Sequence, residues 1–332
     1  MSRPLRTLAL ALVLLAAPAL ASCSAGAAVP PSAPPSTNAT TTAPVSIDNC
    51  GTEITVGSTP PQRIVTVKSQ ALELLLALGA GDRIVGSAFS DGPLPHDLAA
   101  AGADIPVLSD KLPSKETVLA LEPDLVFAGW ESNFSVEGVG ERDALQKLGI
   151  TTYVAPAACK EKAYMPNPLT FDQVFAGFTE AGELVGEQDA AARLVAAQRA
   201  QLKAIVPDTH GLTAVWYSSG KDQPFVGAGI GAPEMIMSAA GLKNAFADVA
   251  DSWTSTSWEL VADANPDVIV LVDSAWNSAA QKIALLKANP VTAELDAVVH
   301  ERFIVVDFPA TEAGVRNVDA VESLVKQAGE LR

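Results

Sequence analysis

The stretch ETVLALEPDLVFAGW, residues 116–130, decides how this chain folds. A short amphipathic run leads into Pro-Asp, and a wholly apolar run that ends in tryptophan follows. Proline ends a helix and disfavours helical geometry in the residue before it, so this order predicts a helix, a turn and a buried strand. Nearly the same order returns in ELVADANPDVIVLVD, residues 259–273, and both copies place a glutamate seven residues before the proline. The chain therefore contains one structural unit twice.

Short apolar runs alternate with helical patterns around both copies. Apolar strands separated by helices are typical of a parallel sheet with helices on both faces. We expect strands at 63–67, 83–88, 125–129, 151–155, 212–219, 267–273 and 302–308. We expect helices at 69–79, 141–149, 171–186, 189–205, 233–241 and 279–290, and a closing helix from residue 318. The sequence predicts an α/β fold of two lobes with parallel-rich sheets.

A helical passage separates the two lobes. In residues 171–186 the apolar side chains fall on one stripe, and Gly186 closes the pattern. We expect an N-terminal lobe at 48–170, a single interlobe helix at 171–186 and a C-terminal lobe at 187–332.

The first 22 residues have the form of a secretory signal. Arg3 and Arg6 precede the apolar run Leu8–Leu20, which is too short to span a bilayer. The run ends in LASC, residues 20–23, which resembles the lipobox of bacterial lipoproteins. Lipidation at Cys23 accounts for the charged start, the apolar run and the lipobox together. An ordinary signal with an incidental cysteine is the alternative.

Residues 23–47 form a segment of different composition. From Ser24 to Ile47 the chain has no charged residue and is dominated by Pro, Ser, Thr and Ala. Such a segment buries too little apolar surface to offset chain entropy, so we expect a disordered tether. Lipid and tether together predict an extracytoplasmic protein held at the outer face of the cytoplasmic membrane by its N-terminal lipid only.

Net charge limits the kinds of partner that this chain can bind, and its cysteine content bears on a disulfide. The signal holds two of the 22 basic residues and none of the 38 acidic ones, which leaves the mature chain at −18. This charge argues against nucleic acid and anionic membranes and favours a cationic protein surface as partner. Cys50 and Cys159 remain after lipidation, and in an oxidising compartment they either form one disulfide or stay as two buried thiols.

From about residue 50 to the end, the chain resembles the solute-binding proteins of ABC importers that carry iron–siderophores, haem and corrinoids. The stretches that carry the resemblance are RIVTVKSQALELLLALG, ETVLALEPDLVFAGW, WELVADANPDVIVLVD and GVRNVDAVESLV. The resemblance implies two Rossmann-like lobes joined by one rigid helix, a small-molecule ligand between them and a monomer without catalytic activity or cofactor.

The resemblance also gives the repeated glutamates a role. In that family a glutamate on each lobe docks into arginine pockets of the two permease subunits, and those glutamates correspond to Glu116 and Glu259. The alternative is a carboxylate that stabilises the positive end of its helix dipole.

The ligand is expected between the lobes, at the carboxyl ends of the strands. The residues that we assign to this site are Lys68, Ser69, Phe89, Trp130, Phe134, Tyr217, Trp253 and Arg316. Six further residues are expected at the same strand ends: Gln70, Trp216, Trp276, Thr311, Glu312 and Asn317. The aromatic members suit the walls of a flat ligand, and Lys68 and Arg316 suit a phosphate or carboxylate. For each aromatic residue the alternative is a core position.

Several longer strings, among them FAGWESNFSVEGVGER and VGAGIGAPEMIM, resemble a subgroup described as importers of a deazaflavin coenzyme precursor. That resemblance implies a bulky, partly aromatic, anionic ligand, and an iron–siderophore or a corrinoid is the alternative. An α/β lipoprotein enzyme is the alternative of another class, and it would need a reactive pair that we do not find. His96, His210 and His300 are scattered without ligand spacing, which argues against a bare metal.

Overall fold

The computed structural model describes residues 46–331. The signal sequence, Cys23 and nearly all of the expected tether lie outside the described residues. Within that part of the chain no helix is long and apolar enough to cross a membrane. At the start of the described part, Ile47 is buried in strand β1 (Ser46–Asn49). This strand pairs with β2 (Thr52–Thr55) as an antiparallel hairpin.

The first lobe contains a five-stranded sheet in the order β5-β4-β3-β6-β7, with every neighbouring pair parallel. Its strands are β3 (Ile64–Val67), β4 (Ile84–Ala88), β5 (Val107–Ser109), β6 (Leu125–Ala128) and β7 (Thr151–Val154). Its helices are α1 (Ser69–Ala77), α2 (His96–Gly102), α3 (Lys115–Leu119) and α4 (Arg142–Gln146). The central strands β3 and β6 are wholly buried, as expected for a sheet covered on both faces.

The second lobe contains a mixed sheet in the order β11-β9-β8-β12-β13, with β10 beside β8. Strands β8 (Thr213–Ser219), β12 (Val268–Asp273), β13 (Phe303–Asp307) and β10 (Lys243–Asn244) run parallel, whereas β9 (Phe225–Gly227) and β11 (Trp253–Ser255) pair antiparallel. The helices are α7 (Ala232–Ala240), α8 (Trp258–Ala264), α9 (Ala279–Ala288), α10 (Asp296–Val299) and α11 (Asn317–Glu330). The predicted α/β architecture of two parallel-rich lobes is confirmed.

The two copies of the repeated unit fold alike. The first becomes α3 followed by β6, and the second becomes α8 followed by β12, with Pro123 and Pro266 in the turns between helix and strand. Each copy therefore places a short helix before a central buried strand of its own sheet.

A helix forms where the sequence predicted the connection between the lobes, and a second helix follows it. Helix α5 (Phe171–Val185) packs on the first lobe, where the Arg83 guanidinium donates to the carbonyl of Val185 at 2.7 Å. Gly186 then adopts a left-handed conformation (φ 74°), which reverses the chain into α6 (Gln188–Ala204).

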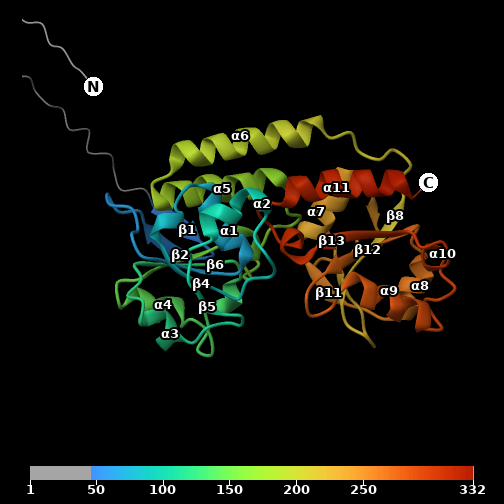
Figure 1. Cartoon of the computed structure of the whole chain (residues 1–332), viewed down its shortest axis with the longest axis horizontal. Helices are drawn as coiled ribbons and strands as arrows, with labels where there is room; N and C mark the ends of the chain where they lie inside the picture. The colour runs from blue at the N-terminus through green and yellow to red at the C-terminus, as the bar shows by residue number, and fades with distance from the viewer. Residues whose placement is uncertain (1–45, 332) are drawn as a thin grey trace, which may run out of the picture. The chain divides into compact units, whose positions relative to one another are not determined.

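Helix α6 makes contacts with both lobes. At its start Glu187 pairs with Arg83 at 2.7 Å, and farther along Gln198 donates to the carbonyl of Val315 at 2.6 Å. Figure 1 shows α6 running beside α5 and then beside α11. Helix α5 also reaches the junction, because Gln173 and Phe178 line one pocket together with Ala313 of the second lobe.

A disulfide joins Cys50, just after β1, to Cys159, just after β7. Beside it, the buried Arg142 guanidinium donates to the backbone carbonyl of Asn49 at 2.7 Å and to that of Thr152 at 3.0 Å. The Asn49 side chain pairs in turn with the backbone of Val154. The N-terminal hairpin is therefore fastened to the edge of the first sheet by one covalent bond and a buried polar network.

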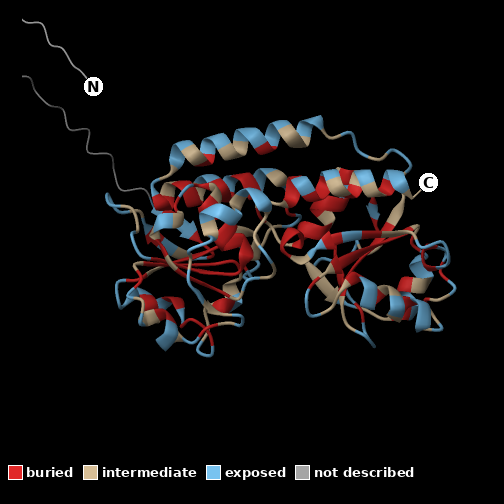
Figure 2. Cartoon of the chain, in the orientation of Figure 1, coloured by how far each residue is buried: buried red, intermediate tan, exposed pale blue. Residues whose placement is uncertain are grey.

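Buried residues gather in both sheets and on the helix faces that cover them, while α6 is exposed over most of its length (Figure 2). Only Ala191 and Gln198 of α6 are buried. This helix therefore contributes more to the connection than to the core.

Candidate functional site

The carboxyl ends of five parallel strands carry the side chains of the candidate site. In the first lobe Lys68, Phe89 and Trp130 follow the neighbouring strands β3, β4 and β6. In the second lobe Trp276 and Phe308 follow β12 and β13, which are also neighbours. In open α/β sheets this edge is where ligands bind.

The Lys68 ammonium brings these side chains together. Its Nζ lies 3.7 Å from the ring centre of Trp130, 4.3 Å from that of Phe89 and 5.4 Å from that of Phe308. The same ammonium forms an ion pair with Asp91, and both side chains are almost fully buried. Cations favour the faces of aromatic rings. Lys68 therefore links aromatic residues of both lobes around one buried charge.

We call Phe89, Trp130, Phe308 and Trp276 the aromatic cluster. Phe89 and Trp130 meet edge to face with ring centres 5.9 Å apart, and Trp276 meets Phe308 in the same way at 6.1 Å. The Trp276 residue is 63% exposed, whereas the other three are partly buried. An exposed indole beside buried rings offers a flat apolar surface to a ligand.

Asp91 fixes the start of α1 as well as Lys68. Its backbone N–H donates to Ser69 Oγ at 2.8 Å, and its carboxylate accepts from the Ser69 N–H at 3.3 Å. Burial raises the pKa of the Asp91 carboxyl, and Lys68 opposes that shift. The Asp91 carboxylate is thus held away from solvent, where the Lys68 ammonium stabilises its charge.

The backbone at this edge is strained in two places. Lys68 has φ 80° and ψ 152°, a region populated almost only by glycine, and Phe89 has φ 55°. Strain of this kind costs about 1–3 kcal/mol per residue and persists where the surrounding structure enforces it, which is common at binding sites.

The segment from Phe308 to Arg316 in the second lobe is bound to the first. The Arg316 guanidinium donates through Nε and Nη2 to the two carboxylate oxygens of Glu73 in α1, at 2.8 and 2.5 Å. It also donates to the carbonyl of Pro93 at 2.6 Å. Trp130 Nε1 donates to Glu312 at 3.1 Å. These contacts position the aromatic cluster across both lobes.

A buried lysine supports the turn that presents Trp276. Lys282 Nζ donates to the carbonyls of Val272 and Asn277 at 2.7 and 2.5 Å, and so fastens both ends of the turn. Burial lowers the pKa of Lys282 to about 8, and Asp273 opposes that shift. The exposed indole therefore stands on a fixed support.

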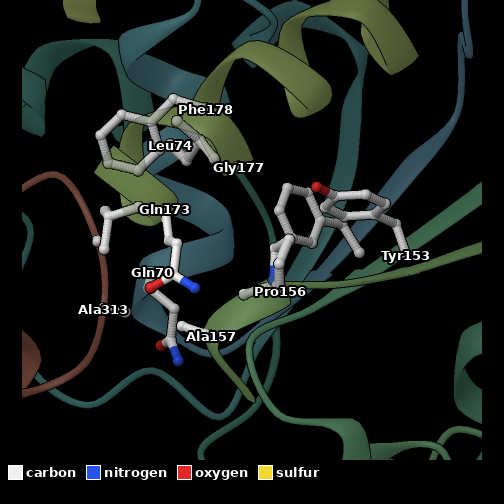
Figure 3. A pocket seen from close by; sticks show the side chains of 13 residues that line it. Gln70, Leu74, Tyr153, Pro156, Ala157, Gln173, Gly177, Phe178 and Ala313 are labelled. Carbon is white, nitrogen blue, oxygen red and sulfur yellow. The ribbon is translucent and has the colours of Figure 1, made fainter. Parts of the chain in front are cut away.

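A separate pocket lies at the junction of the lobes, beside α5 (Figure 3). Its cavity volume is about 30 Å³, and Gln70, Gln173 and Ala313 lie on its walls. Apolar side chains such as Leu74 and Phe178 make up most of the lining. None of the aromatic cluster lines this pocket, so it belongs to the junction and not to the candidate site.

Residues 64–310, which include both sheets and the connecting helices, match the sequence profile of the periplasmic binding protein family. The chain belongs to this family. Two relatives extend the match. An uncharacterized ABC transporter substrate-binding lipoprotein of Bacillus subtilis is 28% identical over 85% of this chain and 85% of that protein. A cobalamin-binding protein of Halobacterium salinarum is 31% identical over 74% of this chain and 62% of that protein.

A solved structure shares the fold of this periplasmic binding protein. It is described as an ABC-type Fe3+-hydroxamate transport system of Saccharomonospora viridis and superposes with a TM-score of 0.73 at 27% identity. The match covers 86% of this chain and 99% of that one. All three similar proteins are named as binding or transport proteins, so the comparisons indicate no catalytic family.

Four of the eight ligand residues expected from the sequence of this periplasmic binding protein meet at the candidate site. Lys68, Ser69, Phe89 and Trp130 lie together, as parallel strands require. Arg316 lies next to them, but it and Lys68 are each paired with a buried carboxylate. Their assignment to an anionic group of the ligand stays a prediction.

Three expected residues of the binding protein lie elsewhere. Tyr217 is 1% exposed and packs edge to face on Trp258 in the core of the second lobe. Phe134 packs on the disulfide, and its ring centre lies 5.7 Å from the Arg142 guanidinium. Trp253 stacks on Phe225 in the β9–β11 ribbon and has no ring contact with the aromatic cluster among residues 46–331.

Asp91, Glu73 and Phe308 are site residues that the sequence did not reveal. Phe308 was hidden because the predicted strand ran to 308, whereas β13 ends at Asp307. Asp91 lies two residues beyond Phe89, so its position after the second strand was an available signal. Glu73 lies inside α1, and nothing local distinguishes it from a surface helix residue. Within residues 46–331 no group of three or more His, Cys, Asp or Glu is arranged to hold a metal ion.

The repeated glutamates occupy equivalent positions in the periplasmic binding protein. Ser114 caps α3 and Ser257 caps α8, and Glu116 and Glu259 are the second residues of those helices. Both carboxylates are exposed, and the pKa of each is lowered by its own backbone N–H and by the capping serine. Figure 1 shows α3 and α8 on the side of the sheets opposite α5, α6 and α11.

The Arg316–Glu73 pair yields a stability prediction for this periplasmic binding protein. Arg316→Ala leaves the Glu73 carboxylate buried without its partner, and we expect the free energy of unfolding at pH 7 to fall by about 3–5 kcal/mol. Burial already raises the pKa of Glu73 above 4.5, and Arg316 is the main group that opposes this. In the variant the folded protein binds the proton before the unfolded chain does, so stability should rise as pH falls from 7 towards 4.5.

Chemical denaturation monitored by circular dichroism at pH 7 and pH 5 measures this effect. The control is the double variant Glu73→Gln/Arg316→Met, which has no buried charge at this position and should regain part of the loss without the pH dependence. Equal stability of Arg316→Ala and wild-type protein at pH 7 would contradict the prediction.

Proposed function

We propose that this periplasmic binding protein is the solute receptor of an ABC importer, and that it captures a bulky small molecule with flat apolar faces between its two lobes. The aromatic cluster is the observation that carries this proposal. Rings from both lobes converge at the carboxyl ends of parallel strands, where this type of sheet binds ligands. Burial of apolar faces supplies the affinity, and few polar groups set the orientation.

The ligand class follows from the relatives and the site together. One relative is named as a cobalamin-binding protein and one similar structure as part of an Fe3+-hydroxamate transport system. Corrinoids and metal chelates are bulky and expose apolar faces, so we propose a ligand of this kind. The deazaflavin precursor expected from the sequence would supply an anion to Lys68 and Arg316. The pairing of both residues with carboxylates disfavours it.

The protein is proposed to act outside the cytoplasmic membrane. The LASC sequence at 20–23 and the lipoprotein relative of Bacillus subtilis both support a lipid anchor on Cys23. Glu116 and Glu259 are proposed to dock with a permease, one on each subunit. Two exposed carboxylates at equivalent helix starts suit a partner with two-fold symmetry.

A binding assay tests the receptor role. We expect that adding a corrinoid or an iron(III) hydroxamate quenches the tryptophan fluorescence of the native protein. The compound that co-purifies with the protein from its own cells should be of the same class. Trp276→Ala removes an exposed wall of the site and should weaken binding about 2- to 12-fold with an unchanged melting temperature, since contacts with an aromatic ring are each worth about 0.5–1.5 kcal/mol. Val305→Ala, outside the cluster, is the control. Unchanged affinity in Trp276→Ala would contradict the assigned site.

The docking role separates transport from binding. Glu116→Ala and Glu259→Ala should each lower uptake by whole cells while the purified proteins keep wild-type ligand affinity, because neither carboxylate is part of the aromatic cluster. The double variant should transport less than either single variant. Normal uptake by the double variant would rule out this role.

The anchor predicts a change of location. Cys23→Ala should be recovered from the medium or the soluble extracytoplasmic fraction instead of the membrane fraction, as detected by immunoblotting. Retention of this variant in the membrane fraction would show that the lipid is not the anchor.

A further inference from the structure

The charged groups of the interlobe site do not balance. Two cations, Lys68 and Arg316, lie there with three carboxylates, Asp91, Glu73 and Glu312. Both cations are bound within the protein: Lys68 by Asp91 beneath the aromatic rings, and Arg316 by both oxygens of Glu73. Among these five groups Glu312 is the one without an ion-pair partner. Lys160 also acts on this carboxyl, but it is exposed to solvent and forms no ion pair with it among the described residues.

Glu312 is held in a fixed place beside the aromatic cluster. Trp130 donates its indole N–H to Oε2, and Asn317 donates its side-chain amide to the backbone carbonyl at 2.7 Å. Within residues 46–331 the Trp130 indole is the one side-chain donor to this carboxylate, so Oε1 is left to accept another hydrogen bond. The residue as a whole is partly exposed, and its carboxylate lies beside Trp130 of the aromatic cluster.

Burial raises the pKa of the Glu312 carboxyl, and the Asp91 carboxylate adds to that shift. The hydrogen bond from Trp130 and the charges of Lys68 and Lys160 oppose it. A carboxylate in such a place is stabilised by any further donor or positive charge. A second anion beside it would be repelled in surroundings of low dielectric constant and would find Lys68 and Arg316 already neutralised.

We propose that Glu312 accepts a hydrogen bond from the bound solute, and that this protein therefore selects solutes that present an amide, an amine or a positive charge at this point and rejects those that present a carboxylate or phosphate. The assignment rests on the proposed receptor function and narrows its ligand class. Specificity of this kind comes from leaving the wrong ligand with an unpaired charge.

Matched probe pairs test this selection. Cyanocobalamin is compared with a cobalamin monocarboxylic acid, in which one side-chain amide is replaced by a carboxylate. Iron(III) ferrioxamine B, with its free ammonium group, is compared with its N-succinyl derivative, which ends in a carboxylate. We expect the wild-type protein to bind the amide or ammonium member of at least one pair about 10-fold or more tightly than the carboxylate member, as measured by fluorescence titration.

The variant Glu312→Gln keeps an acceptor for Trp130 but removes the charge. It should bind the two members of that pair within about 3-fold of each other. Asp307→Asn, the same change on an exposed carboxylate five residues earlier, should keep the wild-type ratio. Equal binding of both members by the wild-type protein, or an unchanged ratio in Glu312→Gln, would overturn the inference alone. If no member of either pair binds the wild-type protein, the proposed ligand class is wrong and this inference falls with it.

Discussion

The bidentate ion pair between Arg316 and Glu73 determines how two lobes can share one site. The Glu73 side chain is 2% exposed, and a carboxylate that is so dry needs its guanidinium partner. Residues 308–316 of the second lobe must therefore stay against α1 of the first. The same segment carries Phe308 and Glu312, which meet Lys68 and Trp130. One buried pair thus positions the aromatic and the acidic parts of the site.

The site is held together by charged groups, yet the surface that it offers to a ligand is apolar. Lys68 is enclosed by Asp91 and by ring faces, so its charge orders the side chains around it and is not available to solvent. Buried ion pairs add little net stability, because the cost of desolvation offsets most of the attraction. What they contribute here is position. The Lys68–Asp91 pair fixes the strained backbone at Lys68, and the Arg316–Glu73 pair holds the segment 308–316 against α1 of the other lobe.

The features that could be predicted from the sequence depend on the spacing of apolar residues along the chain and on the common direction of parallel strands. The repeated helix–proline–strand unit gave both lobes, and the rule that parallel strands end at one edge brought Lys68, Phe89 and Trp130 together. It did not predict pairings between distant residues: Glu73 and Arg316 are 243 positions apart, and neither lies in a distinctive motif. Trp216 and Tyr217 show a second limit. Both faces of β8 are covered, so the alternation along a strand did not reveal that Tyr217 is in the core.

The disulfide has a mechanical consequence. A pull applied to the chain at Ser46 acts on β1 first. The β1–β2 hairpin would yield to such a force one residue pair at a time, from Ser46 towards Asn49. The next residue is Cys50, whose covalent bond to Cys159 passes the force to the segment that follows β7. Peeling can therefore remove one short strand, and beyond it the tension is borne by the parallel sheet of the first lobe.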